Sequence, residues 1–254
     1  MRIHTIGTCA GTEPMPTRQH ACCMFEINNK YYTFDAGNGC SRTAWFKGIP
    51  LPELEHIFIS HPHRDHIGGL PALLWDIRKI VYREDIQHAG KITIHIPSLK
   101  VQNFIEAIKE VEWCDRIKIQ TPLYSDGVIF KDENITVEAR HSFHMGIPDD
   151  GKFSAYSFRI LAEGKKIVYS GDVRSYTDMG NWLNDCDLLL METGHHNAST
   201  VCAGIRADNL NVREIMFVHS GREILNDYDG AKQRAEQAWE KPVIIAEDGL
   251  TYPF

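Results

Sequence analysis

The 254-residue sequence has no run approaching the ~18 apolar residues that a membrane-spanning helix needs. Its first residues, Met-Arg-Ile-His-Thr-Ile-Gly, contain no apolar signal core, so we expect a cytosolic chain with no membrane partner. The seven cysteines are scattered and include no Cys-x-x-Cys pair. This distribution argues against a disulfide framework and against a thiolate zinc site.

Positive charge is also scarce. Lys and Arg number 27 against 34 Asp and Glu, which gives a formal net charge of −7. Proteins that follow a polyanion usually carry basic stripes, so this balance disfavours a nucleic-acid partner, although a local basic patch would be compatible with it. We find no low-complexity linker, charge block or tandem repeat, and therefore predict a single domain over residues 1–254.

Short apolar segments separated by turn residues fill the chain. We expect strands at residues 2–7, 21–27, 31–35, 57–60, 91–96, 117–120, 128–130, 135–141, 154–162, 166–170, 187–191, 214–218 and 243–246. Apolar residues at helical spacing predict helices at 70–80, 101–113 and 230–239. Each half thus has several strands followed by helices. This order predicts an α/β fold with two similar sheets packed together and helices outside.

Histidine is the residue in excess. Of the 13 histidines, three fall in His61-Pro62-His63-Arg64-Asp65-His66, between an expected buried strand and Gly68-Gly69. Residues two apart in an extended segment point the same way, so His61 and His63 can converge on one ion, while the following turn can direct Asp65 and His66 to a second. Each catalytic ion needs about three protein ligands, so later residues must complete the site. Four donors in six residues argue against a polar loop that holds histidines by chance.

The motif resembles the H-x-H-x-D-H signature of the metallo-β-lactamase superfamily. The segments Gly7-Thr8 to Pro14 and Phe34-Asp35-Ala36-Gly37-Asn38-Gly39 are similar to the opening of ribonuclease Z and its phosphodiesterase relatives. Later strand ends are similar as well: Tyr169-Ser170-Gly171-Asp172, Phe217-Val218-His219 and Ala246-Glu247-Asp248-Gly249. The resemblance implies a four-layer αββα sandwich with two mixed sheets between outer helices.

The resemblance also implies two divalent metal ions, with Zn²⁺ expected and Mn²⁺ or Fe²⁺ as alternatives. The implied ligands are His61, His63 and a third histidine for the first ion, Asp65, His66 and His219 for the second, and Asp172 between them. Both His141 and His144 lie near the end of one expected strand. We favour His144 because family members place this ligand in the loop past the strand, and His141 is the open alternative.

Two ions can share a water and lower its pKa to near 7, and Asp65 would orient that nucleophile or accept its proton. Ribonuclease Z-like enzymes use a Glu-supported histidine to protonate the leaving oxygen. Here Glu192 and His196 fit those roles, with His195 as the alternative. Ser220 and Arg222 would contact a phosphate, but the run from His219 to Arg222 is one residue shorter than in ribonuclease Z, which puts that contact in doubt.

Ribonuclease Z carries a long Gly/Pro/Lys-rich arm that grips tRNA, and this sequence has no such insertion. With the net charge of −7, this makes tRNA an improbable substrate and predicts a small-molecule phosphodiester. Exposed Trp and Met side chains would form the surface of a homodimer. The alternative function is hydrolysis of a carbonyl substrate, a thioester, lactone or β-lactam, on the same metals. His63 argues against an iron oxidoreductase, whose relatives usually have Glu there, and the complete ligand set argues against a non-catalytic module.

Overall fold

A computed structural model describes residues 1–84, 90–112 and 117–254 of the chain. These residues form two compact units. Unit 1 comprises residues 1–8, 14–124 and 247–254, and unit 2 comprises residues 9–13 and 125–246. Each unit contains one mixed sheet of seven strands with its own helices, so the predicted pair of sheets is confirmed. The single domain over residues 1–254 stays a prediction.

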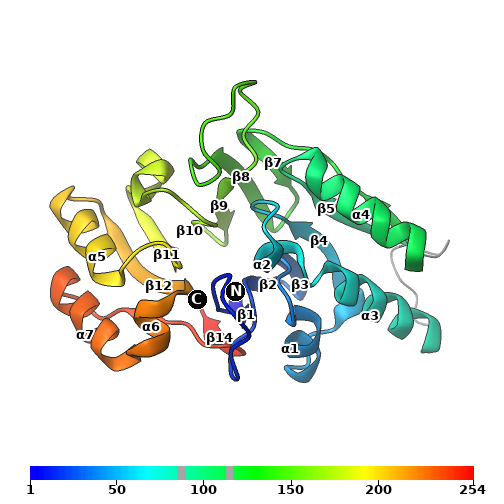
Figure 1. The fold of residues 1–254 in the computed structure, drawn as a ribbon, viewed down its shortest axis with the longest axis horizontal. Helices are drawn as coiled ribbons and strands as arrows, with labels where there is room; N and C mark the ends of the chain where they lie inside the picture. The colour runs from blue at the N-terminus through cyan, green and yellow to red at the C-terminus, as the bar shows by residue number, and fades with distance from the viewer. Residues whose placement is uncertain (85–89, 113–116) are drawn as a thin grey trace. The chain divides into compact units, whose positions relative to one another are not determined.

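The sheet of unit 1 has the strand order β14-β1-β2-β3-β4-β5-β6. Its strands are β1 (Arg2–Gly7), β2 (Cys22–Ile27), β3 (Lys30–Phe34), β4 (Leu54–Phe58), β5 (Lys91–His95), β6 (Lys118–Gln120) and β14 (Leu250–Pro253). Its helices are α1 (Cys40–Phe46), the 3-10 helix η1 (Leu51–Glu53), α2 (Arg64–Ile67), α3 (Leu70–Arg83) and α4 (Leu99–Glu112). The first and last strands pair antiparallel, which brings the two chain ends together (Figure 1). The predicted helix 101–113 begins earlier, at Leu99, and its predicted last residue, Trp113, lies outside the described residues.

The sheet of unit 2 has the strand order β13-β12-β11-β10-β9-β8-β7. Its strands are β7 (Gly127–Lys131), β8 (Ile135–His141), β9 (Tyr156–Ala162), β10 (Lys165–Tyr169), β11 (Cys186–Thr193), β12 (Val212–Ser220) and β13 (Ile244–Ile245). Its helices are the 3-10 helix η2 (Tyr176–Leu183), α5 (Ala198–Ala207), α6 (Arg222–Asn226) and α7 (Tyr228–Trp239).

The two sheets share one pairing pattern. Strands β14 to β3 and strands β7 to β10 pair antiparallel, whereas β3 to β6 and β10 to β13 pair parallel. The carboxyl ends of the parallel strands in each sheet therefore lie at one edge, where side chains on the following loops can gather. His61 to His66 follow β4, Asp172 follows β10 and His219 lies at the end of β12, and these three strands belong to the parallel pairs. His144 follows β8, which pairs antiparallel with both of its neighbours.

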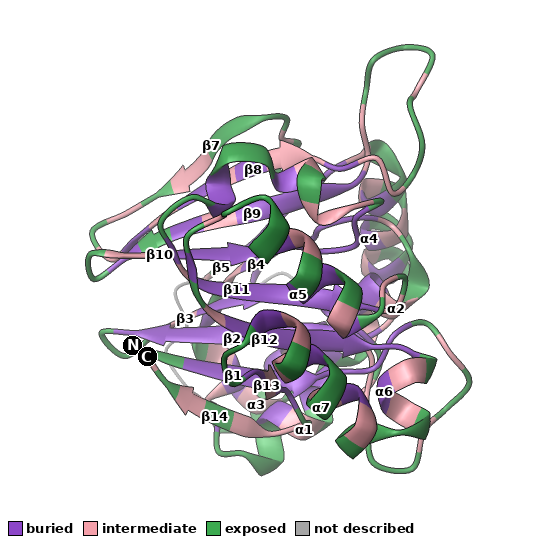
Figure 2. Cartoon of the chain, turned by 90° about the vertical axis from the view of Figure 1, so that its left-hand side faces the viewer, coloured by how far each residue is buried: buried purple, intermediate pink, exposed green. Residues whose placement is uncertain are grey.

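Local chemistry explains several of the elements. Asn28 and Asn29 have φ of 50° and 61° and join β2 to β3 with a two-residue turn, which is the turn that a hairpin of right-twisted strands prefers. In unit 2 the strands β11 and β12 are buried along most of their length, while α5 and α7 present exposed residues outward (Figure 2). Such continuous burial is expected for parallel strands covered on both faces.

The sequence analysis did not predict α1, α5 or β14. Helix α5 contains Thr200, Val201 and Gly204, which are weak helix formers. It folds because Ala198, Val201, Cys202 and Ile205 recur at helical spacing and are buried in the core of unit 2. Tertiary packing thus overrides intrinsic propensity in this helix.

The six cysteines in the described residues are buried and form no disulfide. Cys114 lies outside those residues. No helix in the described part of the chain has the length and apolar character needed to cross a membrane.

Candidate metal centre

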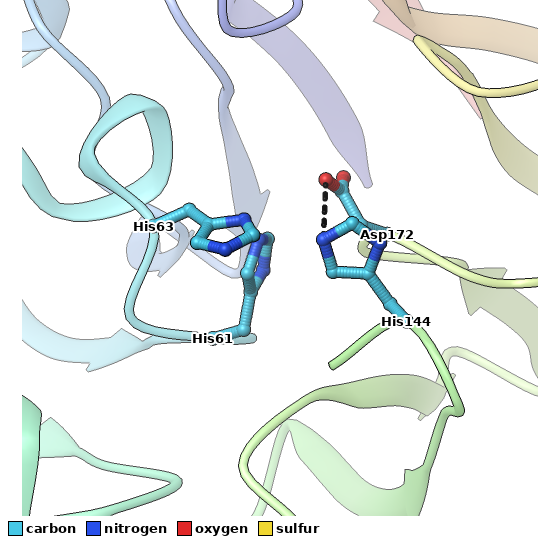
Figure 3. A group of neighbouring side chains, drawn as sticks. All are labelled: His61, His63, His144 and Asp172. Atoms are coloured by element: carbon cyan, nitrogen blue, oxygen red, sulfur yellow. Dashed lines mark hydrogen bonds and ion pairs between the residues drawn. The ribbon is translucent and has the colours of Figure 1, made fainter. Parts of the chain in front are cut away.

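The loop after β4 presents two pairs of donor atoms in unit 1. His61 Nε2 and His63 Nδ1 lie 3.0 Å apart, and the two rings meet edge to face with an interplanar angle of 75° (Figure 3). His66 Nε2 and Asp65 Oδ2, from α2, lie 3.5 Å apart. Ligand atoms that bind one Zn²⁺ at about 2.0–2.2 Å lie roughly 3–3.5 Å from each other, so each pair has the spacing of a shared ion.

Asp35 fixes the orientation of this loop. Its carboxylate, fully buried at the end of β3, accepts hydrogen bonds from the backbone N–H of Ser60 at 2.7 Å and the Ser60 hydroxyl at 2.8 Å. It also accepts the N–H of His66 Nδ1 at 2.7 Å, which leaves Nε2 of that ring on the side of Asp65. The sequence analysis did not assign Asp35 to the metal site. The contacts show that it positions a candidate ligand, as buried carboxylates do beside metal-binding histidines.

Close backbone packing explains the glycines that flank the motif. A Cβ added at Gly69 would lie 2.1 Å from the carbonyl oxygen of Gly37, and one added at Gly37 would lie 2.3 Å from the carbonyl oxygen of Asp65. Both positions therefore require glycine for the turn between β4 and α3 to close against the loop after β3.

Asp172 is the centre of the donors in unit 2. It follows β10 and is 2% exposed. Its Oδ2 lies 3.6 Å from His144 Nε2, the contact dashed in Figure 3, and its Oδ1 lies 3.5 Å from His219 Nε2. The two oxygens of one carboxylate thus face two different imidazoles, which is the arrangement that a bridging carboxylate needs.

A β-bulge places His219. The register of β11 and β12 shifts between Glu192 and Thr193, and His219, opposite that shift, has a left-handed φ of 50°. A left-handed conformation is costly for a residue other than glycine, and such residues concentrate at functional sites. The bulge turns a side chain from a buried strand toward Asp172.

The two histidines left open in the sequence analysis have different surroundings. His141 Nδ1 lies 2.7 Å from Asp126, and its ring stacks on Phe153 with the centroids 4.0 Å apart. His144 instead faces Asp172. These contacts favour His144 as the ligand, in agreement with our prediction, which stays a prediction.

Glu192 is fully buried and joins three histidines. Its carboxylate accepts the backbone N–H of His195 at 2.9 Å and lies 3.2 Å from His195 Nδ1 and 3.3 Å from His196 Nε2. Burial raises the pKa of the Glu192 carboxyl, but hydrogen bonds from His195, His196 and His219 outweigh it and hold that pKa below its usual range. The same bonds raise the pKa of both His195 and His196.

His195 and His196 differ in side-chain exposure and in their hydrogen-bond partners. The side chain of His195 is 45% exposed, and its ring lies 4.7 Å from that of His144. His196 is 18% exposed and its Nε2 donates to the carbonyl oxygen of Val173 at 2.9 Å. The geometry therefore favours His195, the alternative of our sequence analysis, as the histidine that could reach a substrate.

Asp178 in η2 supports the unit 2 ligands and was not identified from the sequence. Its Oδ2 accepts the backbone N–H groups of Phe143 and Arg174, each at 3.0 Å. These residues stand next to His144 and two positions after Asp172, so one carboxylate oxygen holds both ligand loops. No local motif marks such a residue, because its partners come from separate strand ends.

Ser220 and Arg222, which the sequence analysis predicted to contact a phosphate, follow His219. Arg222 is exposed and forms an ion pair with Glu13, whereas Ser220 is buried and its backbone oxygen accepts the N–H of Ala10 at 3.0 Å. Their contact with phosphate stays a prediction.

Comparison with known proteins supplies the family context. The model of the "Beta-lactamase superfamily domain" matches residues 32–221. A ribonuclease Z of Methanocaldococcus jannaschii is 31% identical, over 99% of this chain and 96% of its own length. Human tRNase Z, short form, superposes with a TM-score of 0.72 at 20% identity over 100% of both chains. The metallo-β-lactamase fold protein YhfI of Bacillus subtilis superposes with a TM-score of 0.77 at 19% identity, over 99% of this chain and 98% of its own.

These likenesses confirm one prediction and overturn another. They confirm the metallo-β-lactamase αββα fold with its two mixed seven-stranded sheets. The prediction of a small-molecule substrate with tRNA improbable is wrong, because relatives named ribonuclease Z align over nearly the whole chain. Net charge and the absence of one arm do not decide this question, since the affinity for a polyanion depends on local patches of charge.

Proposed function

Because the chain belongs to the β-lactamase superfamily and is a hydrolase of that family, we propose that it is a metal-dependent phosphodiesterase that cleaves RNA. The RNA substrate is suggested by the ribonuclease Z of M. jannaschii, which is 31% identical over almost the full length of both chains. The observation that carries the chemistry is Asp172, whose two carboxylate oxygens face His144 and His219 separately.

In the proposed function, seven candidate ligands would hold two divalent metal ions. In this proposal Asp172 contributes to both sites, which are completed by His61, His63 and His144 for the first ion and by Asp65, His66 and His219 for the second. Imidazole nitrogen and carboxylate oxygen suit Zn²⁺ first, with Mn²⁺ and Fe²⁺ as alternatives. When bound, the two ions would lower the pKa of a shared water and offset negative charge on the phosphate.

The chain's own residues would handle the protons and the geometry. Asp65 would accept a hydrogen bond from the attacking water and its proton. The bond from phosphorus to the ribose oxygen breaks as the water oxygen attacks, and the leaving alkoxide takes a proton from His195. Glu192, within 3.2 Å of His195 Nδ1, would hold that ring in place. We assign the proton to His195 rather than to His196, whose Nε2 is engaged with the carbonyl of Val173.

The test uses the chain purified without chelators and two substrates. Elemental analysis should find about two equivalents of metal, as a dinuclear centre requires. The chain should release a labelled 3′ trailer from a precursor tRNA and should hydrolyse bis-p-nitrophenyl phosphate. Turnover of thioesters or lactones without either phosphodiester would favour the carbonyl alternative. A metal content far below one equivalent that soaking does not restore would exclude the dinuclear centre.

The two substrates also separate the histidines. A p-nitrophenolate leaves without a proton, whereas a ribose alkoxide needs one. His195→Ala should therefore slow RNA cleavage by roughly 10²–10⁴-fold and diester hydrolysis far less, because general acid catalysis contributes about that much. His196→Ala is the matched control, and a larger effect on RNA cleavage for this variant would return the assignment to His196.

A further inference from the structure

Aromatic and basic side chains gather on neighbouring helices of unit 1, away from the ligand loop. Helices α1 and α3 lie side by side (Figure 1) and border a pocket of about 450 Å³. We call this the α1/α3 surface and define it by five of its lining residues: Arg42, Trp45, Phe46, Lys79 and Arg83. The carboxylates Asp76 and Glu84 line the same pocket.

The rings on this surface are unusually exposed. Phe46 is 72% and Trp45 49% exposed, although large apolar side chains in a folded chain are normally buried. The guanidinium of Arg42 lies 5.1 Å from the centre of the Phe46 ring, which holds a cation beside an aromatic face. Lys79 has the same relation to Trp75, at 4.4 Å. Flat rings and cations are thus presented together.

The charge of these helices opposes that of the chain. Residues 40–47 and 70–84 contain five Lys or Arg residues against two carboxylates, Asp76 and Glu84, whereas the chain carries a net charge of −7. Proteins that bind single-stranded nucleic acid combine a positive groove for the phosphates with aromatic rings on which bases stack. The α1/α3 surface has both components.

We propose that the α1/α3 surface binds a single-stranded segment of RNA, with bases stacked on Trp45 and Phe46 and phosphates paired with Arg42, Lys79 and Arg83. The choice of RNA rests on the proposed function. A second copy of the chain is a poorer occupant, because cations outnumber carboxylates on these helices by five to two and a twofold interface would bring this excess of positive charge together. A strand of phosphates is complementary to that charge.

The position of the surface suits a substrate strand. Helix α3 begins at Leu70, four residues after the candidate ligand His66, and Lys79 and Arg83 stand on its later turns. At about 1.5 Å per helical residue, these cations lie roughly 14–20 Å along the helix from its start. A stacked strand covers about 3.4 Å per nucleotide, so the surface would contact RNA about four to six nucleotides from the bond that is cut.

Binding of a fluorescently labelled single-stranded RNA of about a dozen nucleotides to the full chain tests the inference, with the RNA checked for integrity after each titration. Trp45→Ala and Phe46→Ala should each raise Kd about tenfold, because each removes a ring on which a base would stack. Lys79→Ala and Arg83→Ala should each reduce the slope of log K against log salt by about 0.7. The matched controls are Tyr228→Ala and Lys232→Ala on α7, which should change neither Kd nor slope.

Other outcomes are informative as well. An unchanged Kd in all four α1/α3 variants would overturn the inference. The inference would also be overturned if sedimentation shows that the chain is a dimer and that Trp45→Ala dissociates this dimer without changing the affinity for RNA. A second copy of the chain would then occupy the surface. If the α1/α3 variants bind RNA more weakly but the wild-type chain hydrolyses neither phosphodiester, the result would support this surface and refute the proposed function. If the wild-type chain hydrolyses both phosphodiesters but the variants bind RNA unchanged, the result would support the proposed function and refute this surface.

Discussion

The two units share a sheet topology but present their candidate ligands in different ways. Unit 1 supplies four ligands from one loop after β4, His61 to His66, within six residues. Unit 2 supplies His144, Asp172 and His219 from three loops or strand ends that are far apart in the sequence. The first arrangement depends on one local turn. The second depends on the order in which the strands pair.

The support behind the ligands differs in the same way. In unit 1 the buried Asp35 holds His66 and both hydrogen-bond donors of Ser60. In unit 2 Asp178 holds the backbone of two loops, and Glu192 holds a group of histidines. The support in unit 2 is therefore divided among separate residues, so the loss of Asp178 alone should weaken metal binding no more than the loss of Asp35 in unit 1.

The largest expected effect is that of Asp172→Ala. Because its two oxygens face His144 and His219, Asp172 serves both proposed ions, so the variant should lose both and reduce phosphodiester hydrolysis by at least about 10³-fold. His61→Ala should remove mainly one ion. Metal content per chain and the rate on bis-p-nitrophenyl phosphate measure the difference. Equal metal loss in the two variants would contradict the bridging role.

A smaller loss is expected for Asp35→Asn in unit 1. The asparagine oxygen would keep the bond from the backbone N–H of Ser60, so its NH2 group would face His66 Nδ1, which could then bond to it only as an acceptor. The proton would then sit on Nε2, the nitrogen that faces Asp65, and block metal binding there. Loss of such a partner typically weakens metal affinity by about 10–100-fold, which competition with a chelator would measure. Unchanged affinity would show that the tautomer of His66 is not set by Asp35.

Asp178→Ala should weaken metal binding in unit 2 through the loops. Without its carboxylate the backbone N–H groups of Phe143 and Arg174 lose their common acceptor, and we expect about tenfold weaker metal affinity. Asp178→Asn keeps an oxygen that can accept these bonds, so this variant should retain most of the wild-type metal affinity. Asp126→Ala is the matched control, because it removes the partner of His141 rather than of His144. A stronger effect at Asp126 would favour His141 as the ligand.

The comparison also explains what the sequence could predict. The loop of unit 1 was recognisable because its ligands are contiguous and their spacing has a direct geometric meaning. Asp172 and His219 became candidates only through resemblance, since a Gly-Asp turn or a histidine at a strand end is unremarkable alone. Asp178 and the bulge at His219 depend on pairing between distant strands, so no local pattern marks them. The substrate was predicted wrongly because net charge is a sum over the chain and does not show where the charges lie.

The sheets should also differ in their response to acid. In unit 1 β5 buries His95, 4% exposed, with its ring centroid 4.4 Å from that of Phe58 and 5.6 Å from that of His56. The buried histidine of the unit 2 sheet, His219, instead lies beside the carboxylates of Asp172 and Glu192. Burial, with a smaller contribution from His56, lowers the pKa of His95 from 6.5 to about 3. His95 is therefore neutral in the folded chain at pH values where the unfolded chain begins to bind a proton.

This difference predicts the smallest effect, one on stability alone. The contribution of neutral His95 is complete above pH 6.5 and is lost as the pH falls from there toward 3. At pH 5 the loss should be about 2 kcal/mol, at about 1.4 kcal/mol per pH unit below the unfolded value. In chelator, the free energy of unfolding by urea should fall less between pH 8 and pH 5 for His95→Phe than for the wild type. The wild type and His95→Phe contain the same carboxylates, whose titration therefore cancels in the comparison. An equal decrease in the free energy of unfolding for the two proteins would mean that His95 does not set the acid sensitivity of unit 1.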